Sequence, residues 1–198
     1  MSSAASGGSA RSVERILAVA IFALALYQLY LSSKVGVTPR GTPAREALQH
    51  MHVSLGLTIL FLLLPRLWLK WRLPREPRPA RVPASADAFA RWCTTGFLAT
   101  LLLLCLSGPV FAWSEAHKVS WFGILNFPDL VAASYRVQVA LGYLHSMFGF
   151  VIFYLAGLCV VTALWQMVRY RVSPQRMLPG FAWSAASEGH TPGPGYAK

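Results

Sequence analysis

Charged residues are scarce in this chain of 198 residues, and acidic residues are scarcer still. Only 13% of the residues are charged while 55% are apolar, whereas about a quarter are charged in a typical soluble domain. The 7 Asp and Glu form no pair within an apolar stretch, which disfavours a transporter or channel built on intramembrane carboxylates. Glu115 and Asp129 lie outside those stretches, where exposure to water accounts for them.

Cysteine and histidine are also rare. Cys93, Cys105 and Cys159 are isolated within apolar stretches, so they predict neither a disulfide framework nor a CxxC metal site. No histidine occurs before residue 50, and the first apolar stretch therefore cannot supply an imidazole ligand. Because no small-residue cleavage site follows that first stretch, we expect it to be a retained helix rather than a signal peptide.

Long apolar stretches are what the chain has in abundance. A bilayer span needs about 20 mostly apolar residues, and four stretches qualify, at 15–31, 48–69, 89–113 and 137–168. Since lipid offers no partner to open backbone groups, each span should be helical. The sequence thus predicts an all-α membrane protein. Its four-transmembrane-helix bundle lies within residues 15–180, between a disordered N-terminus (1–14) and a flexible tail (181–198).

The basic residues are distributed unevenly between the connections. Of the 18 Lys and Arg, 13 belong to the N-terminal segment, the second connection and the C-terminal tail. The first and third connections hold the other five: Lys34, Arg40, Arg45, Lys118 and Arg136. The positive-inside rule then places both termini in the cytoplasm of a bacterial inner membrane. The net charge of +11 is therefore a topology signal with anionic lipid as a partner, and no nucleic-acid partner is expected.

The stretch SEAHKVSWFGILNFPDL, between the third and fourth spans, is neither polar throughout nor long enough to cross a bilayer. We expect it to be an interfacial segment that lies along the outer surface, with Trp113, Trp121 and Phe122 as anchors. The third span ends in LSGPVFAW. A Gly-Pro pair within a span usually kinks the helix, and here it could open room for a cofactor.

Two histidines lie inside apolar stretches, where an ionisable ring is costly without a dedicated role. At 1.5 Å per residue from the expected outer helix ends, His52 lies about 10 Å deep and His145 about 16 Å deep. Two imidazoles from different helices in one layer are what a haem iron needs as axial ligands. We therefore predict haem b near the periplasmic face. The alternative is a pair of polar residues hydrogen-bonded inside the bundle.

Glycines lie near both histidines along the helices. Gly56 follows His52 by one turn, and Gly142 and Gly149 flank His145. Glycine lets a porphyrin approach a helix closely, so we predict that all three border the cofactor, although glycine serves ordinary helix packing as well.

The other three histidines have weaker claims. His50 is two residues from His52, so the two side chains point about 200° apart and cannot face the same haem; His50 is nearer to water. His117 lies in the external segment and is expected to be exposed, with a quinone or partner contact as the alternative. His190, in the tail, receives no role.

These stretches together resemble the bacterial cytochrome b561 family, whose best-known member is a four-helix di-haem protein described as a superoxide:ubiquinone oxidoreductase. The resemblance rests on HVSLGL in the second span, the basic proline-rich connection, SGPV…WFG after the third span, and HSMFGF through RMLP at the end. It covers roughly residues 15–180. It implies two haems, each held by a histidine pair, and a quinone partner. His52 and His145 match the pair nearer the periplasm.

The second histidine pair of that family has no counterpart here. One of its members stands near the start of the first helix, where this chain has only Arg15, Ile16 and Leu17. The other stands fourteen residues after the first histidine of the fourth helix, at Cys159, about 21 Å deeper on the same helix face. We therefore expect a divergent member that binds one haem.

The prediction is a membrane-bound b-type cytochrome that exchanges electrons with quinol or a periplasmic redox protein through one bis-histidine haem. Such ligation leaves no open iron position, which favours electron transfer over oxygen chemistry. Because one haem on one side cannot carry an electron across the hydrocarbon core, superoxide:quinone oxidoreductase activity is not predicted. The alternative is a degenerate accessory subunit of a larger respiratory or photosynthetic complex. Haem content separates the two.

Overall fold

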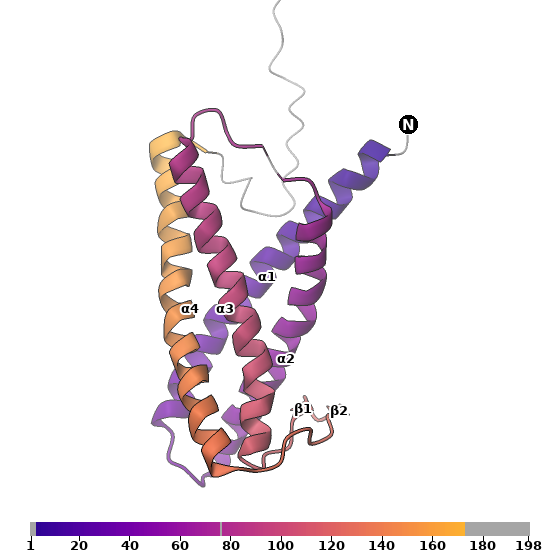
Figure 1. Cartoon of the computed structure of the whole chain (residues 1–198), viewed down its shortest axis with the longest axis vertical. Helices are drawn as coiled ribbons and strands as arrows, with labels where there is room; N and C mark the ends of the chain where they lie inside the picture. Colours follow the sequence, from indigo (N-terminus) through magenta and orange to yellow (C-terminus); the bar gives the residue numbers. More distant parts are fainter. Residues whose placement is uncertain (1–2, 76, 173–198) are drawn as a thin grey trace, which may run out of the picture.

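The computed structural model describes residues 3–75 and 77–172, with side chains from residue 8 onward. Four long helices dominate it (Figure 1), and each is long and apolar enough to cross a membrane. This confirms the predicted fold class. The helices are α1 (Ser3–Val37), α2 (Pro43–Arg72), α3 (Ala84–Ser114) and α4 (Tyr135–Tyr170). The RMLP motif, His190 and the tail 181–198 lie outside the described residues.

Helix α1 begins earlier than its composition suggests. The segment 1–14 is expected to be disordered, yet the chain is helical from Ser3 onward. The Ser12 hydroxyl donates a hydrogen bond to the carbonyl of Gly8, one turn back. Once the apolar part of α1 has nucleated the helix, further turns need no new nucleus. No proline interrupts these residues, so the helix extends beyond the span.

The junction between α1 and α2 determines how far along the bundle each residue of α2 lies. Pro43 occupies the first position of α2, and the Thr42 hydroxyl accepts a hydrogen bond from the backbone N–H of Arg45, a normal helix start. The Arg45 guanidinium donates to the carbonyls of Val35 and Thr38 at 2.7 and 2.6 Å. It thereby satisfies carbonyl groups that the end of α1 leaves open.

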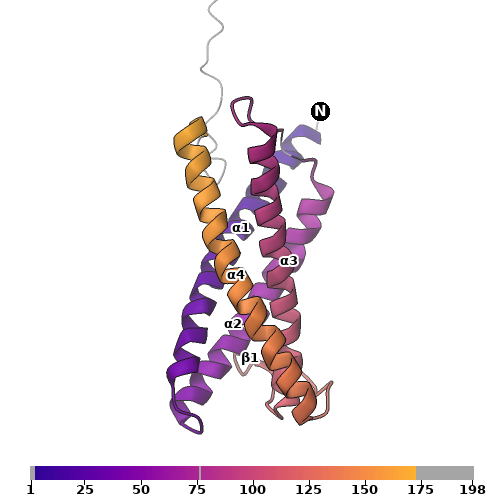
Figure 2. The ribbon, with the colours of Figure 1, turned by 60° about the vertical axis from the view of Figure 1, so that its left-hand side comes forward.

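The four helices pack as two hairpins. α1 packs along α2 and α3 packs along α4, whereas α2 meets α3 over a smaller area and contact between α1 and α4 is at most marginal in the described residues. Figures 1 and 2 show α1 running obliquely to the α3–α4 pair. The two hairpins therefore meet mainly through α2 and α3. Side chains of α2 and α4 can approach one another between the hairpins.

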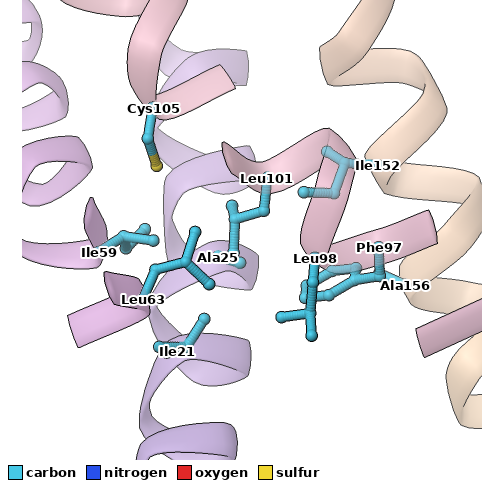
Figure 3. Packing of buried hydrophobic residues seen from close by; sticks show 10 residues of the cluster. All are labelled: Ile21, Ala25, Ile59, Leu63, Phe97, Leu98, Leu101, Cys105, Ile152 and Ala156. Atoms are coloured by element: carbon cyan, nitrogen blue, oxygen red, sulfur yellow. The ribbon is translucent and has the colours of Figure 1, made fainter. Parts of the chain in front are cut away.

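A buried apolar cluster joins the hairpins at mid-height (Figure 3). Along the helices it lies between His52 and His145 and the end of the bundle that holds the α2–α3 connection. Figure 3 shows Leu101 of α3 between the side chains of α1 and α2 and those of α4, with Cys105 on the side of Ile59. The ten fully buried members are Ile21, Ala25, Ile59, Leu63, Phe97, Leu98, Leu101, Cys105, Ile152 and Ala156.

The connection between α3 and α4 folds back onto α2. It contains a small antiparallel hairpin of β1 (Ser120–Trp121) and β2 (Leu125–Asn126), whose turn includes Gly123 at φ 72°. The Ser54 hydroxyl of α2 donates to the carbonyl of Ser120 and accepts from the backbone N–H of Phe122. These bonds tie the outer ends of the two hairpins together.

Two of the three aromatic residues expected to anchor this segment in the membrane surface have other contacts. Trp113 is only 8% exposed and packs in a cluster with Leu57 and Val119, so its assignment as an anchor was wrong. The indole N–H of Trp121 donates to the Thr58 hydroxyl at 3.0 Å. Phe122 remains exposed. Hydropathy predicts that such a segment lies at the membrane surface. It does not predict that the aromatic side chains of the segment pack against α2.

Candidate functional site

His52 of α2 and His145 of α4 meet inside the outer half of the bundle. Their ring centroids lie 6.3 Å apart, with an interplanar angle of 74°. His52 follows the start of α2 by nine residues and His145 follows the start of α4 by ten, which corresponds to depths of about 14 and 15 Å. The structure therefore places the two rings in one layer, nearly a hundred residues apart in the chain.

The separation of the two rings suits a metal ion between them. A metal–imidazole bond is about 2 Å long, and the ring nitrogen lies about 1.2 Å from the ring centre, so the centres of two opposite ligands are roughly 6 Å apart. The 6.3 Å between His52 and His145 matches this value. Among the described residues no group of three or more His, Cys, Asp or Glu could hold a metal ion. A two-histidine site fits an iron whose other ligands come from a porphyrin.

His145 is oriented by three neighbours on α3. Its Nδ1 lies 3.0 Å from the Ser107 hydroxyl, and its ring stacks on Phe111 with centroids 6.3 Å apart. A Cβ atom added to Gly108 would lie 3.4 Å from Cε1 of His145, so glycine allows the ring to approach α3 closely. Because Ser107 engages Nδ1, the other ring nitrogen, Nε2, is the one left to coordinate.

The ring of His52, unlike that of His145, has no hydrogen-bond partner at Nδ1. This nitrogen is buried, and a buried polar atom without a partner is uncommon. Its backbone carbonyl accepts a hydrogen bond of 2.7 Å from the side-chain amide of Gln28 in α1. The unpaired Nδ1 leaves the hydrogen bonding of the ring incomplete, and Nε2 is then the nitrogen that could ligate a metal, as at His145.

The three glycines predicted to border the cofactor have different neighbours. A Cβ on Gly56 would lie 3.3 Å from the Gln28 amide nitrogen, and one on Gly142 would lie 3.3 Å from the Phe111 ring. Gly149 has nothing within 4 Å of such an atom. Gly56 and Gly142 thus admit side chains of neighbouring helices, and Gly149 leaves open space. Their assignment to the cofactor remains a prediction.

Sequence reasoning missed Gln28, Ser107 and Gly108. The signal that could have revealed Gln28 and Ser107 is the one used for the histidines, namely a polar side chain within an apolar span. Gly108 was noted only for its possible kink with Pro109, and α3 is assigned as one continuous helix through both residues. Their proximity to the two histidines depends on how the hairpins dock, which the sequence does not display.

The remaining described histidines lie apart from the pair. His50 is exposed at the outer part of α2. His117 is 57% exposed at its side chain, and its Nδ1 lies 3.4 Å from the Glu115 carboxylate, whose other oxygen accepts from Gln138. These residues border a hollow of about 440 Å³ between the end of α3 and the start of α4, at the same end of the bundle as the histidine pair.

The half of the bundle that holds the start of α1 and the α2–α3 connection contains a different set of groups. Leu17 and Cys159 pack against the mid-height apolar cluster. Arg66, counted among the connection residues in the sequence, lies within α2 and is only 8% exposed. Its guanidinium pairs with the Glu14 carboxylate of α1 at 3.3 Å. This half of the bundle is thus filled by an apolar core and an ion pair.

Comparison with known proteins identifies the family of the chain. The family model described as prokaryotic cytochrome b561 matches residues 5–180, which include both histidines and all but the first two residues of the four helices. No curated protein matches the chain.

Proposed function

Because the chain belongs to the prokaryotic cytochrome b561 family, we propose that it carries electrons through one haem b held between His52 and His145. The family and the four apolar helices make it a membrane b-type cytochrome of electron transfer. The observation that carries the finer proposal is the pair of imidazoles with centroids 6.3 Å apart, at the spacing of two opposite axial ligands.

The side chains around the pair orient it for ligation. The Ser107 hydroxyl at Nδ1 of His145 selects Nε2 as the coordinating atom and limits rotation of the ring. Phe111 stacks against the same ring and excludes water from that side. When bound, haem b supplies a one-electron couple between ferric and ferrous iron. Two histidine ligands leave no open iron position, which favours electron transfer over oxygen chemistry.

A single haem is supported by what fills the cytoplasmic half. Cys159 occupies the helix position of the family's deeper histidine, but it packs against the apolar cluster. The opposite position on α1 offers Arg15, Ile16 and Leu17, none of which is an imidazole. The buried contact between Arg66 and Glu14 further occupies this region. Transmembrane electron transfer would need a second centre there.

The electron is exchanged on the outer side, with quinol or ubiquinone, or with a periplasmic redox protein. The asymmetry of basic residues supports cytoplasmic termini and a bacterial inner membrane. With that orientation, the hollow beside His117 and Glu115 opens to the periplasm at the same end as the histidine pair. It offers a polar surface near the site. Superoxide:quinone oxidoreductase activity is not part of the proposal, since it would need the second haem.

A role as an accessory subunit of a larger respiratory or photosynthetic complex is the alternative. The observation that favours it is the open face of α4, the least buried of the four spans. Phe150, Phe153 and Tyr154 on this helix are each more than half exposed. Lipid covers such a face in a protein that works alone, and another subunit covers it in a complex.

The first test is the amount of haem per polypeptide, measured as the pyridine haemochrome on detergent-purified protein beside a reduced-minus-oxidised spectrum. We expect one b-type haem with the low-spin spectrum of bis-histidine ligation. Two haems would overturn the single-site proposal and restore a transmembrane route. An absence of haem in protein expressed with sufficient haem supply would favour the accessory subunit.

A further inference from the structure

Gln28 places a side-chain amide of α1 directly against the residue proposed as a haem ligand. Its nitrogen Nε2 donates a 2.7 Å hydrogen bond to the backbone carbonyl of His52. Because a carbonyl oxygen can only accept, this contact determines which end of the amide carries the nitrogen. The other end, Oε1, is therefore an acceptor, and it is buried without a partner.

The second unpaired atom at this contact belongs to His52 itself. Among the described residues three buried side-chain polar atoms lack a hydrogen-bond partner: Gln28 Oε1, His52 Nδ1 and Trp113 Nε1. Two of the three thus belong to two residues that already touch. Buried polar atoms are nearly always paired in folded proteins, so the coincidence calls for a common explanation.

The two atoms are chemically complementary. When an imidazole coordinates a metal through one nitrogen, the other carries the proton and donates a hydrogen bond to an oxygen of the protein. If His52 coordinates through Nε2, its Nδ1 is a donor that needs an acceptor, and Oε1 of Gln28 is an acceptor that needs a donor. At His145 the Ser107 hydroxyl already fills the corresponding role at Nδ1.

We propose that Gln28 is the positioning residue of His52, and that its Oε1 accepts the Nδ1 proton of His52 when haem is bound. The inference rests on the proposed haem site. Close packing supports it, because a Cβ on Gly56 would lie 3.3 Å from the Gln28 amide nitrogen. Glycine at this position lets the amide lie against α2 within one turn of His52. The first helix, which has no histidine, thereby contributes to the site.

The test compares Gln28→Met with Gln28→Glu. Methionine has a similar length but removes both the donor and the acceptor, whereas glutamate keeps a carboxyl oxygen that can accept from Nδ1. Loss of the acceptor makes the imidazole a weaker electron donor to iron, so ferrous haem is favoured. We expect Gln28→Met to raise the midpoint potential and to weaken haem retention by about 10–100-fold, measured as haem loss to an excess of an apo-globin. Gln28→Glu should keep the haem and lower the potential below that of the wild type, because an anionic acceptor at Nδ1 makes the imidazole a stronger electron donor to iron.

A matched control is available on α4. The Gln166 amide donates to the backbone carbonyl of Ala86 at 3.3 Å, a bond of the same kind far from the histidines. Gln166→Leu should leave the potential and haem retention unchanged. If Gln28 only anchors the backbone of His52, both Gln28 variants will lose stability and neither will shift the potential, which overturns the proposal.

The outcomes separate this proposal from the proposed function. Wild-type protein without haem would contradict the haem site itself. Wild-type protein with haem, together with an unshifted potential in Gln28→Met, would contradict only the role of Gln28. If Gln28→Met fails to fold, Gln28→Glu decides the question: a potential below that of the wild type supports the acceptor role, and an unchanged or higher potential overturns the proposal.

Discussion

The imidazole rings of His52 and His145 lie with their centroids 6.3 Å apart, one on each of two helical hairpins. His52 belongs to the α1–α2 hairpin and His145 to the α3–α4 hairpin. The hairpins are joined through α2 and α3, through the mid-height apolar cluster and through the hydrogen bonds of Ser54 to the outer loop. The geometry of the histidine pair therefore depends on docking rather than on either hairpin by itself.

Replacing His145 should abolish haem retention. In His145→Ala a single imidazole remains, and one axial bond holds haem b weakly compared with two. The haem-to-protein ratio of the purified variant measures this directly. His117→Ala provides the control, because that ring lies in the exposed outer loop and should be dispensable for binding. Unchanged haem content in His145→Ala would refute the ligand assignment.

His50 and His52 should behave differently although they are two residues apart. His50 is exposed, whereas His52 faces His145. We expect His52→Ala to lose the low-spin b-type spectrum and His50→Ala to retain it, as seen in reduced-minus-oxidised spectra. The reverse result would exchange the two roles.

Loss of the Ser107 hydroxyl should weaken haem binding without eliminating it. Ser107→Ala leaves Nδ1 of His145 without its partner at 3.0 Å. Removal of such an outer-shell group typically costs about 10–100-fold in metal affinity. Haem loss to an excess of an apo-globin gives the change. Thr162→Val is a suitable control, since the Thr162 hydroxyl bonds only to carbonyls of its own helix. Equal haem loss from both variants would argue against the role of Ser107.

Cys159→Ala should leave the visible spectrum unchanged. Cys159 stands at the family's deeper ligand position but packs against the apolar cluster. With one haem between His52 and His145, its thiol contacts no cofactor. A shifted or diminished haem band in this variant would reveal a second site that the single-haem proposal omits.

The ion pair of Arg66 and Glu14 should contribute to stability and not to haem binding. Arg66→Met would leave the Glu14 carboxylate partly buried without its partner. We expect a smaller loss than the about 3–5 kcal/mol seen on breaking fully buried pairs, because the Glu14 side chain is 24% exposed. Thermal unfolding in detergent measures the loss.

The double variant Glu14→Leu/Arg66→Met tests whether the loss of stability in Arg66→Met comes from the unpaired Glu14 carboxylate. It should recover much of the stability, since apolar residues can replace a buried ion pair at little cost. Both variants should retain haem. If the double variant is less stable than Arg66→Met, the ion pair is not the reason for the loss.

The positions of the helices were largely predictable from the sequence, although the helices extend beyond the predicted spans by up to about twelve residues. The family model and the four apolar helices confirm the fold class. The common depth of His52 and His145 follows from counting residues along each helix. These features are local, because hydropathy and helical rise are set by neighbouring residues along the chain.

Contacts between elements were not predictable in the same way. Trp113 was assigned to the membrane surface but is buried against Leu57, because the outer loop folds over α2. Arg66 was counted with a connection but is paired with Glu14 inside the bundle. In both cases hydropathy did not indicate which neighbour the side chain contacts.

The sequence by itself determined that this protein crosses a membrane four times and carries two histidines at one depth, since both depend only on apolar length and helical geometry. Only the tertiary structure decided that Ser107 meets Nδ1 of His145 and that Gln28 reaches His52. Those contacts arise from the rotation and crossing of helices distant in sequence. Side-chain packing across the whole bundle sets that rotation, and no single segment encodes it.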